Sequence, residues 1–371
     1  MNKILPKGGG APKVKREPGN TKQTLQNLKG EIEFRAKLAR QHVDDEVLLP
    51  DYYRKEDHDR ILLDRVLSTA EKMRDLADLG VRFSPFLELG AERGQRSLVL
   101  VNDFAADGIA ADISYHQLNT MRHFSQIFRR EKLPMRICCD ANYLPFKSEA
   151  FSFIFCYEFL HHFPSLRPVI SEVHRVLGDG YFYFDEEPFK RVLRLRLYRQ
   201  KSKIYSQRSL SKNKWRALIE GFISEPSSDE VEHGIIENEN IGLAEWSSAL
   251  GVFDDCSTKL ASVGNVTSKL GPRLRPRNAA NFLLGGRISG LCRKKSRRQQ
   301  PGRRTVRELL ACPGCVRQAS SGWSDPPELL NSAEGLTCSS CGVEYPEKEG
   351  ILFLLPRAEL EQLYPSFARS S

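Results

Sequence analysis

Four cysteines near the C-terminus are spaced as ligands of one metal ion. Cys312 and Cys315 form a C-x-x-C pair, and 22 residues separate it from a second pair, Cys338 and Cys341. Two such pairs can place four thiolates tetrahedrally around Zn²⁺. Disulfides are the alternative, but the N-terminus has no apolar stretch typical of a secretion signal, which favours a reducing compartment. The pattern predicts a structural zinc site with no open position for catalysis.

A glycine turn follows a short apolar run earlier in the chain. Leu87-Glu88-Leu89 leads into Gly90-Ala91-Glu92-Arg93-Gly94, and a helix is expected to begin there. Glycines let the backbone approach a ligand closely, and the helix N-terminus offers unpaired N–H groups. Because glycine turns also close ordinary strand–helix corners, the turn by itself leaves both roles open.

Acidic residues stand at the ends of successive predicted strands. Glu88 lies in the first strand, Asp112 follows Gly90 by 22 residues, and Asp140 closes the third strand. A carboxylate about twenty residues after such a turn is typical of a ribose-binding position, although helix capping is the alternative. Together the three acids favour a nucleoside-containing cofactor. NAD is disfavoured because GAERG lacks the G-x-G-x-x-G spacing that a pyrophosphate needs.

Alternating strand and helix signals position these residues. Helical periodicity runs from about residue 56 to Gly80, over 118–128 and over 166–177, and it alternates with apolar runs that read as buried strands. The five runs are 86–89, 108–113, 136–141, 151–158 and 180–187. This order predicts a doubly wound, Rossmann-like α/β fold. After residue 188, a helix at 243–250 and a strand-like run near 279–287 are interpreted as a lid plus closing strands. For the whole fold we expect a mostly parallel seven-stranded sheet.

These motifs resemble those of class I S-adenosylmethionine (SAM)-dependent methyltransferases, of the type that includes ubiquinone-biosynthesis methyltransferases. The resemblance covers about residues 80–190 and rests on LELGAERGQRS, ADIS, CDANYLPFKSEAFSFIFCYEFLHHF and EVHRVLGDGYFYFDEEP. It implies three groups of cofactor contacts. Glu88, Gly90 and Gly94 would border the methionine part of the cofactor, Asp112 would bind the ribose hydroxyls, and Asp140 with Ala141 would flank the adenine.

One position departs from the family pattern. Glu92 stands where the family usually has a second glycine, and we expect its φ to be negative and its side chain to point outward. If the glutamate instead spoils the turn, the chain is a non-catalytic module that docks a partner protein. This is the alternative from another class of function.

Candidate catalytic groups follow the fourth and fifth strands. His161 and His162 can serve as general bases because imidazole titrates near neutral pH, and Glu186 faces the same edge of the sheet. Structural roles remain open for both histidines, and capping remains open for Glu186 and Glu187. The Asn-Pro-Pro-Tyr-like run of base N-methylating families and the Pro-Cys nucleophile of pyrimidine C-methylating families are both absent here. The prediction is therefore methyl transfer to an oxygen or nitrogen atom.

The net charge of +9 is concentrated in two short stretches. Residues 1–22 carry +5 and residues 287–307 carry +9, which leaves −5 for the rest of the chain. An acidic folded part favours a small metabolite, a lipid-linked intermediate or a saccharide as the acceptor. RNA held by the basic stretch is the alternative, and it predicts steeply salt-dependent binding. No apolar run approaches the ~18 residues of a membrane span.

We expect six segments along the chain. They are a disordered basic arm (1–22), a helical or extended segment (23–55), a methyltransferase domain (56–290), a basic linker (291–307), a zinc ribbon (308–357) and a tail (358–371). The ribbon resembles small zinc-ribbon proteins that activate certain RNA and protein methyltransferases, here joined in cis. The polar run around His233 is expected to be a surface loop, and the other cysteines are expected to be core or incidental: Cys138, Cys139, Cys156, Cys256 and Cys292. The expected location is cytoplasmic.

Overall fold

The computed structural model describes seven ranges of the chain: 21–44, 55–189, 241–261, 267–268, 286–296, 305–318 and 327–368. The loop expected around His233, nearly all of the expected N-terminal arm and residues 297–304 of the expected linker lie outside these ranges. No helix in the described ranges is long and apolar enough to cross a membrane.

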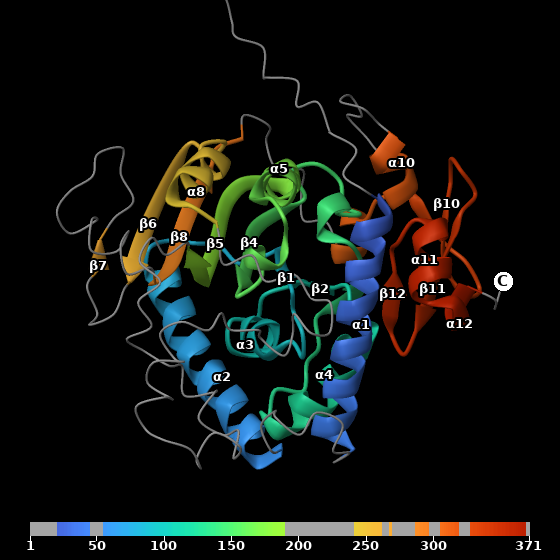
Figure 1. Cartoon of the computed structure of the whole chain (residues 1–371), viewed down its shortest axis with the longest axis horizontal. Helices are drawn as coiled ribbons and strands as arrows, with labels where there is room; N and C mark the ends of the chain where they lie inside the picture. The colour runs from blue at the N-terminus through green and yellow to red at the C-terminus, as the bar shows by residue number, and fades with distance from the viewer. Residues whose placement is uncertain are drawn as a thin grey trace, which may run out of the picture.

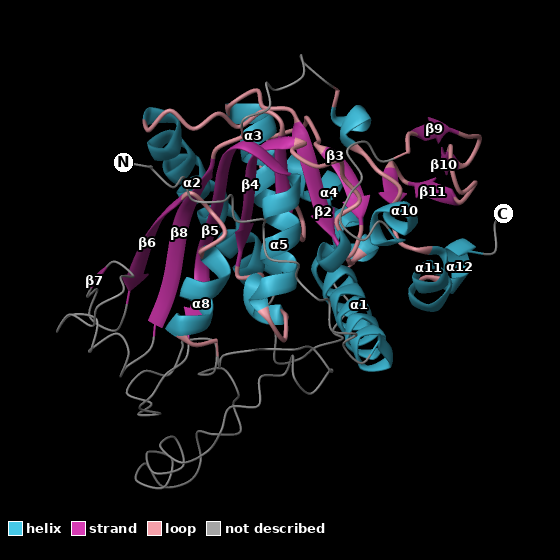
Figure 2. Ribbon diagram, turned by 90° about the horizontal axis from the view of Figure 1, so that it is seen from above, coloured by secondary structure: helices cyan, strands magenta, loops and turns pink. Residues whose placement is uncertain are grey.

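The described strands join in one 12-stranded mixed sheet, in the order β7-β6-β8-β5-β4-β1-β2-β3-β12-β11-β10-β9 (Figures 1 and 2). Their bounds are β1 Phe86–Leu89, β2 Gly108–Asp112, β3 Met135–Cys138, β4 Phe151–Tyr157, β5 Leu177–Phe189, β6 Asp255–Ala261, β7 Thr267–Ser268, β8 Gly286–Lys294, β9 Leu329–Asn331, β10 Gly335–Cys338, β11 Glu344–Lys348 and β12 Ile351–Phe353. Strands β1 to β5 are parallel neighbours, and β8 runs antiparallel between β5 and β6.

The doubly wound α/β prediction is confirmed, but the predicted seven-stranded, mostly parallel sheet is wrong. The strands of the expected ribbon do not form a sheet of their own. They continue the main sheet, because β12 pairs in parallel with β3 from Ile351↔Arg136 to Phe353↔Cys138. Strand β12 thus forms backbone hydrogen bonds with the edge of β3 that faces away from β2, so this edge of the sheet is not left open.

Helices cover both faces of the sheet, as Figure 2 shows. On one face lie α5 (Leu166–Val176) and α8 (Leu243–Leu250), which pack on Leu87, Ile109 and Ile154. On the other lie α2 (Lys55–Asp78), α3 (Gln95–Asp103) and α4 (Tyr115–Ile127), over Phe86 and Ala110. Each strand contributes side chains to the hydrophobic cores on both faces of the sheet, because successive side chains point to opposite faces. Helix α1 (Thr21–Val43) packs on α4.

The segment expected as a C-terminal tail is folded up to residue 368. It forms α11 (Arg357–Leu363) and α12 (Pro365–Ala368). Leu360, Leu363 and Tyr364 are buried in the same core as α1 and α4. Their apolar spacing at i, i+3 and i+4 is the helical signal that the sequence carried here.

The expected basic linker starts inside a strand. Strand β8 includes residues 291–294, and the strand expected near 279–287 is observed from Gly286 onward. Lys294 is buried, and its ammonium group donates hydrogen bonds to the carbonyl oxygens of His174 (2.7 Å) and Leu177 (2.6 Å). Arg293 pairs with Asp179 at 2.5 Å. The ammonium group of Lys294 lies at the C-terminal end of α5, where the helix dipole stabilises a cation. A basic residue of this stretch can therefore belong to the folded sheet, and basic composition alone does not identify a linker.

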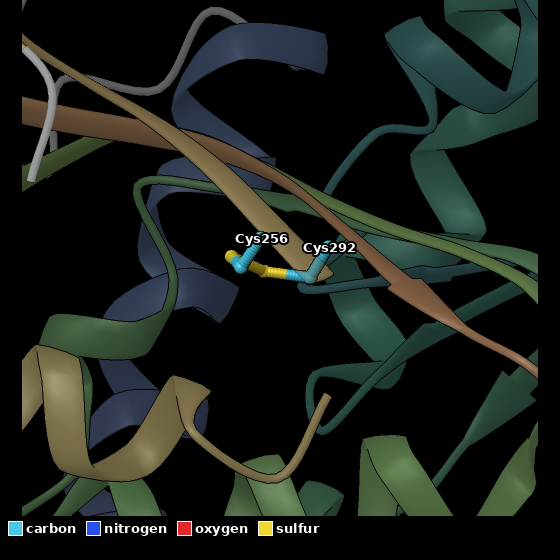
Figure 3. Close-up of a disulfide and its surroundings, with 2 residues drawn as sticks. All are labelled: Cys256 and Cys292. Carbon is cyan, nitrogen blue, oxygen red and sulfur yellow. A yellow bond between two sulfur atoms is a disulfide. The ribbon is translucent and has the colours of Figure 1, made fainter. Parts of the chain in front are cut away.

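Cys256 and Cys292 form a disulfide, which Figure 3 shows. The two residues stand directly opposite each other in the antiparallel pair β6–β8. The expectation that these cysteines are incidental is therefore wrong for this pair, since sequence spacing does not reveal which residues face each other across strands. Cys138, Cys139 and Cys156 are free and buried, as expected.

Candidate functional site

The glycine turn joins β1 to the first residue of α3. Gly90 and Gly94 have φ values of 64° and 69°, in the left-handed region that glycine adopts without steric cost. A Cβ atom at Gly90 would collide with the ring of Phe159, and one at Gly94 would collide with the side chain of Met121. Both glycines are thus required by backbone conformation and by packing.

Glu92 adopts a left-handed conformation within this turn. Its φ is 47°, so the expectation of a negative φ is wrong. Its carboxylate accepts a hydrogen bond from Arg35 Nη1 of α1 at 3.1 Å and lies 3.9 Å from Arg65 Nη1 of α2. Burial raises the pKa of Glu92, but Arg35 and Arg93 outweigh it and hold the pKa well below its usual range. These ion pairs offset the ~1–2 kcal/mol that a left-handed glutamate costs.

The Asp112 carboxylate holds the turn from the end of β2. Its Oδ2 accepts the amide hydrogen of Glu92 (2.9 Å), and its Oδ1 accepts that of Ser114 (2.8 Å). Burial raises the pKa of Asp112 to about 6, against which the two amide bonds act. A carboxylate has about four acceptor positions, so capacity remains for a vicinal diol. The residue predicted to bind ribose lies at the predicted edge.

Asp140 stands two residues beyond β3, the neighbour of β2. It caps the short helix η1 (Ala141–Tyr143), with its Oδ1 accepting the amide hydrogen of Asn142 at 2.8 Å. It is buried, and burial raises its pKa to about 6. Ala141 follows directly and is also buried. The capping role is therefore real, and it coexists with the predicted position beside the end of β2.

Glu88 connects β1 to α3. It is fully buried, and its Oε2 accepts hydrogen bonds from the backbone amide of Ser97 (2.9 Å) and from the Ser97 hydroxyl. Burial raises its pKa to about 7, opposed chiefly by Arg96. This carboxyl therefore fixes the first turn of α3 relative to β1, beneath the glycine turn.

His161 is held by a carboxylate from the fifth strand. Glu187 is fully buried and accepts the amide hydrogens of Phe159 (2.8 Å) and Leu160 (3.0 Å), which begin the short helix η2 (Leu160–His162). Its Oε2 also lies 3.0 Å from His161 Nδ1. A proton on Nδ1 directed at the carboxylate leaves the lone pair on Nε2, the arrangement that suits a general base. The His162 ring lies 4.3 Å from the His161 ring.

Glu186 has other contacts than its neighbour Glu187. Its carboxylate lies 3.9 Å from Arg287 Nη1 of β8, so the structure does not pair it with His161. Its φ is 64°, and Glu158, after β4, has a φ of 46° and an ion pair with Arg65 at 3.2 Å. Left-handed acids thus stand after β1 (Glu92), after β4 (Glu158) and at the irregularity within β5 (Glu186). Strained residues cluster at functional sites, which makes this edge a candidate site.

Arg35, Arg65 and Glu187 are the residues of this edge that sequence reasoning missed or left undecided. The two arginines lie on helices that precede the recognisable motifs by more than twenty residues. Charge at helical spacing usually indicates a solvated face, so no local signal marked them. For Glu187, the adjacent proline gave a turn signal but no indication of its contact with His161.

The four C-terminal cysteines come together as predicted. Their sulfur atoms all lie within 4.8 Å of one another, with Cys312 Sγ 3.6 Å from Cys341 Sγ and Cys315 Sγ 3.8 Å from Cys338 Sγ. Tetrahedral zinc–thiolate bonds of ~2.3 Å place sulfurs about 3.8 Å apart, so the spacing fits a four-thiolate site. These distances are too long for disulfides. The cluster sits between α10 (Pro313–Gln318) and β10.

The cysteine cluster lies against the loop that follows Asp140. Arg317 of α10 stacks over the ring of Tyr143 at 3.7 Å and pairs with Glu359 at 2.6 Å. The amide of Ala311 also donates to the carbonyl oxygen of Pro145 at 2.9 Å. The ribbon therefore supports the candidate adenine side of the edge directly.

The conformation of Glu92 leads to a prediction about glycine at this position. Glu92→Gly is expected to unfold at a higher temperature than Glu92→Ala. Both variants lose the ion pairs with Arg35 and Arg65, but only glycine takes a φ of 47° without cost, a difference of about 1 kcal/mol. Thermal unfolding followed by circular dichroism measures this.

The matched control is Glu71, an exposed residue inside α2. There glycine should be the less stable of the two substitutions by about 1 kcal/mol, because glycine weakens a helix interior. An alanine at position 92 that is as stable as glycine would contradict the left-handed turn.

His58 predicts an acid-sensitive contact between the N-terminal helices and the turn. Its ring stacks on His42 at 3.6 Å, and Arg93 contacts His42 Nδ1 at 2.9 Å. Burial, together with Arg93 and His42, lowers its pKa from 6.5 to about 2. Below pH 6.5 the unfolded chain therefore takes up a proton that the folded chain refuses. The free energy of unfolding should fall by up to ~1.4 kcal/mol per pH unit from pH 6 to pH 4.

Urea unfolding of His58→Gln across that pH range is the comparison. The amide does not titrate, so the variant should lose less stability on acidification than the unchanged protein, by close to one proton's worth. Parallel pH profiles would show that His58 is protonated as easily folded as unfolded.

The comparisons with known proteins agree with this edge. Residues 87–184 match the family model described as a methyltransferase domain. That segment runs from β1 into β5 and contains the glycine turn, Asp112, Asp140 and His161. The α/β fold and this match support the class of SAM-dependent methyltransferases. The chain matches no curated protein.

Several solved structures resemble the chain weakly. Geranyl diphosphate C-methyltransferase from Streptomyces coelicolor A3(2), bound to S-adenosyl-L-homocysteine, has 14% identity and a TM-score of 0.37 over 61% of this chain and 75% of its own. For the complex of the Haloferax volcanii Trm112 methyltransferase activator and a putative methyltransferase, the identity is 15% and the TM-score is 0.38, over 64% of this chain and 94% of the matched chain. A putative sarcosine dimethylglycine methyltransferase from Galdieria sulphuraria has 16% identity and a TM-score of 0.38, over 62% of this chain and 86% of its own. Because the identities and TM-scores are this low, these likenesses do not indicate the substrate of this chain.

Proposed function

We propose that the protein is a SAM-dependent methyltransferase that methylates an oxygen or nitrogen atom of a small-molecule, lipid-linked or saccharide acceptor. One observation carries the proposal. Within the segment that matches a methyltransferase domain, the half-buried carboxylate of Asp112 and the buried carboxylate of Asp140 lie at neighbouring strand ends beside a left-handed glycine turn. Ligands of doubly wound folds bind at this edge of the sheet.

Different residues at this edge of the sheet would contact different parts of the cofactor. Asp112 would accept hydrogen bonds from the ribose hydroxyls with its remaining acceptor capacity, and Asp140 with Ala141 would flank the adenine. Glu88, Gly90 and Gly94 would border the methionine part of the cofactor. The cofactor supplies an activated methyl group on a sulfonium, and the protein aligns acceptor, methyl and sulfur.

His161 is the proposed general base. Its Nδ1 is fixed by Glu187 at 3.0 Å, which orients the ring and favours the tautomer with Nε2 unprotonated. Nε2 can then take the proton of the acceptor group as methyl transfer proceeds. His162 and Glu186 stay candidates for binding the acceptor, because both lie at the same edge.

In the part of the basic stretch that the structure describes, the charges do not favour RNA as the acceptor. Four of the nine basic residues of 287–307 form ion pairs within the fold: Arg287 with Glu186, Arg293 with Asp179, Lys294 with Glu149 and Arg307 with Glu347. Charges already neutralised in this way contribute little to phosphate binding. A small acceptor therefore fits the folded part better.

We also propose that the cysteine cluster holds one structural Zn²⁺. Backbone amides support the thiolates, with Cys315 N donating to Cys312 Sγ (3.4 Å) and Ser340 N to Cys338 Sγ (3.4 Å). Four sulfur ligands leave no position for a substrate, so the metal would stabilise the ribbon and take no part in the chemistry.

Isothermal titration of the full chain with SAM and S-adenosylhomocysteine tests the function. Micromolar binding supports it. The absence of heat and of any thermal shift at millimolar cofactor would instead favour the non-catalytic scaffold. S-adenosylhomocysteine retained on the purified protein, detected by mass spectrometry, would support the same assignment without an added ligand.

A further inference from the structure

Tyr364 joins the C-terminal helices to the loop that follows Asp112. Its hydroxyl donates a hydrogen bond to the carbonyl oxygen of Ile113 at 2.6 Å and accepts one from the amide of Tyr115 at 3.0 Å. Tyr364 is 3% exposed, and these two bonds use both the donor and an acceptor of the phenol. One side chain thus fixes the backbone on both sides of Ser114.

Ser114 is the residue whose amide orients Asp112. That amide donates to Asp112 Oδ1 at 2.8 Å, while the Ser114 hydroxyl caps α4 by accepting the amide hydrogen of Gln117 at 3.4 Å. Ser114 is fully buried. The direction of its N–H bond depends on the peptide planes that Tyr364 holds. A shift of that loop would therefore rotate the Asp112 carboxylate.

Aromatic rings and the main sheet surround the ring of Tyr364. Its ring lies 5.3 Å from the ring of Phe353 and 5.8 Å from that of Phe367. Phe353 belongs to β12 and pairs with Cys138 of β3, so the ring rests on the main sheet. Burial raises the pKa of Tyr364 well above its ordinary value, which keeps the phenol protonated as a donor.

We propose that Tyr364 is a positioning residue for the cofactor: through Ile113 and Tyr115 it holds Asp112 in the orientation that binds the ribose diol. This inference rests on the proposed function and extends it to α11 and α12. Those helices then contribute to cofactor affinity without contacting the cofactor.

The test is Tyr364→Phe in the full chain, which removes one oxygen atom and keeps the ring. Titration calorimetry should show S-adenosylhomocysteine binding roughly three- to thirty-fold more weakly, because the orientation that one or two neutral hydrogen bonds fixed beforehand must then be fixed on binding. Hydrogen exchange should show faster exchange at the Tyr115 amide, which loses its acceptor. Titrations run well below the melting temperature of the variant, so that only folded protein is compared.

Two control variants separate positioning from general damage. Tyr181→Phe removes a tyrosine hydroxyl from β5, away from the Asp112 loop, and Phe367→Leu disturbs the aromatic packing around Tyr364 but keeps its hydroxyl. Both should bind within about twofold of the unchanged protein. A Phe367→Leu variant that binds as weakly as Tyr364→Phe would assign the effect to packing and overturn the inference.

The remaining outcomes are distinguishable. If the unchanged protein binds the ligand and Tyr364→Phe binds equally well, the positioning role is wrong, while the proposed function stands. If the unchanged protein does not bind, the proposed function fails, and the positioning role fails with it. Faster exchange at Tyr115 would then still report the hydroxyl contact as a structural one.

Discussion

Substituting Cys338 with serine is expected to release zinc and to unfold the C-terminal strands. Cys338 is 2% exposed, its Sγ lies 3.8 Å from Cys315 Sγ, and it accepts amide hydrogen bonds from Ser340 and Cys341. Structural zinc contributes roughly 10 kcal/mol or more of apparent binding free energy in small zinc domains, because folding and metal binding are one event there. The melting temperature should fall by roughly 10 °C or more.

Metal analysis and limited proteolysis make the measurement. The unchanged protein should carry one zinc ion per chain, and the variant should lose it and become sensitive to protease between residues 327 and 353. Cys139→Ala is the matched control, since Cys139 is a buried free cysteine outside the cluster. A purified protein that holds no metal and whose melting temperature ignores a chelator would refute the zinc assignment.

Asp112→Ala is expected to abolish measurable cofactor binding. The substitution removes the proposed partner of the ribose hydroxyls and also the acceptor for the amides of Glu92 and Ser114. Each charge-assisted hydrogen bond is worth ~1.5–3 kcal/mol, so the dissociation constant should rise at least a hundredfold in titration calorimetry. Asp103→Ala, which loses a surface ion pair with Arg130, should bind as the unchanged protein does.

The same carboxylate predicts how affinity depends on pH. Because burial raises the pKa of Asp112 to about 6, the ionised form that accepts two ribose hydroxyls is lost as the pH falls through 6. Affinity for S-adenosylhomocysteine should therefore be constant above pH 7 and weaken below pH 6. Binding that is unchanged at pH 5, or retained in Asp112→Ala, would place the cofactor elsewhere.

Local patterns were sufficient to predict the central strands and the acids at their ends. Apolar runs bounded by turns predict β1, β2 and β4, and the carboxyl ends of parallel strands meet at one edge, so the sequence alone predicts that Asp112 and Asp140 lie near each other. The two C-x-x-C pairs likewise predict that the four sulfur atoms lie together, because this spacing is typical of a four-thiolate metal site. In each case the determinant lies within a few residues of the feature.

Long-range pairings were not predictable from the same patterns. Arg35 meets Glu92 across 57 positions, and the β12–β3 pairing joins segments more than two hundred residues apart. The ion pair with Arg35 accompanies the left-handed conformation of Glu92, whereas a rule based on residue type alone predicts the opposite sign of φ. Cys256 and Cys292 became partners only through the strand order of the sheet.

The pairing of β12 with β3 also has a consequence for solubility. Strand β3 is the last parallel strand of the methyltransferase-like half, and it carries buried apolar side chains on both faces. If the chain ended before residue 305, β3 would keep its pairing with β2, but the backbone groups on its other side would lose their β12 partners at an open sheet edge, a template on which other chains assemble. The ribbon thus covers a sheet edge that would otherwise be open, and a chain shortened before residue 305 is expected to aggregate more readily than the full chain.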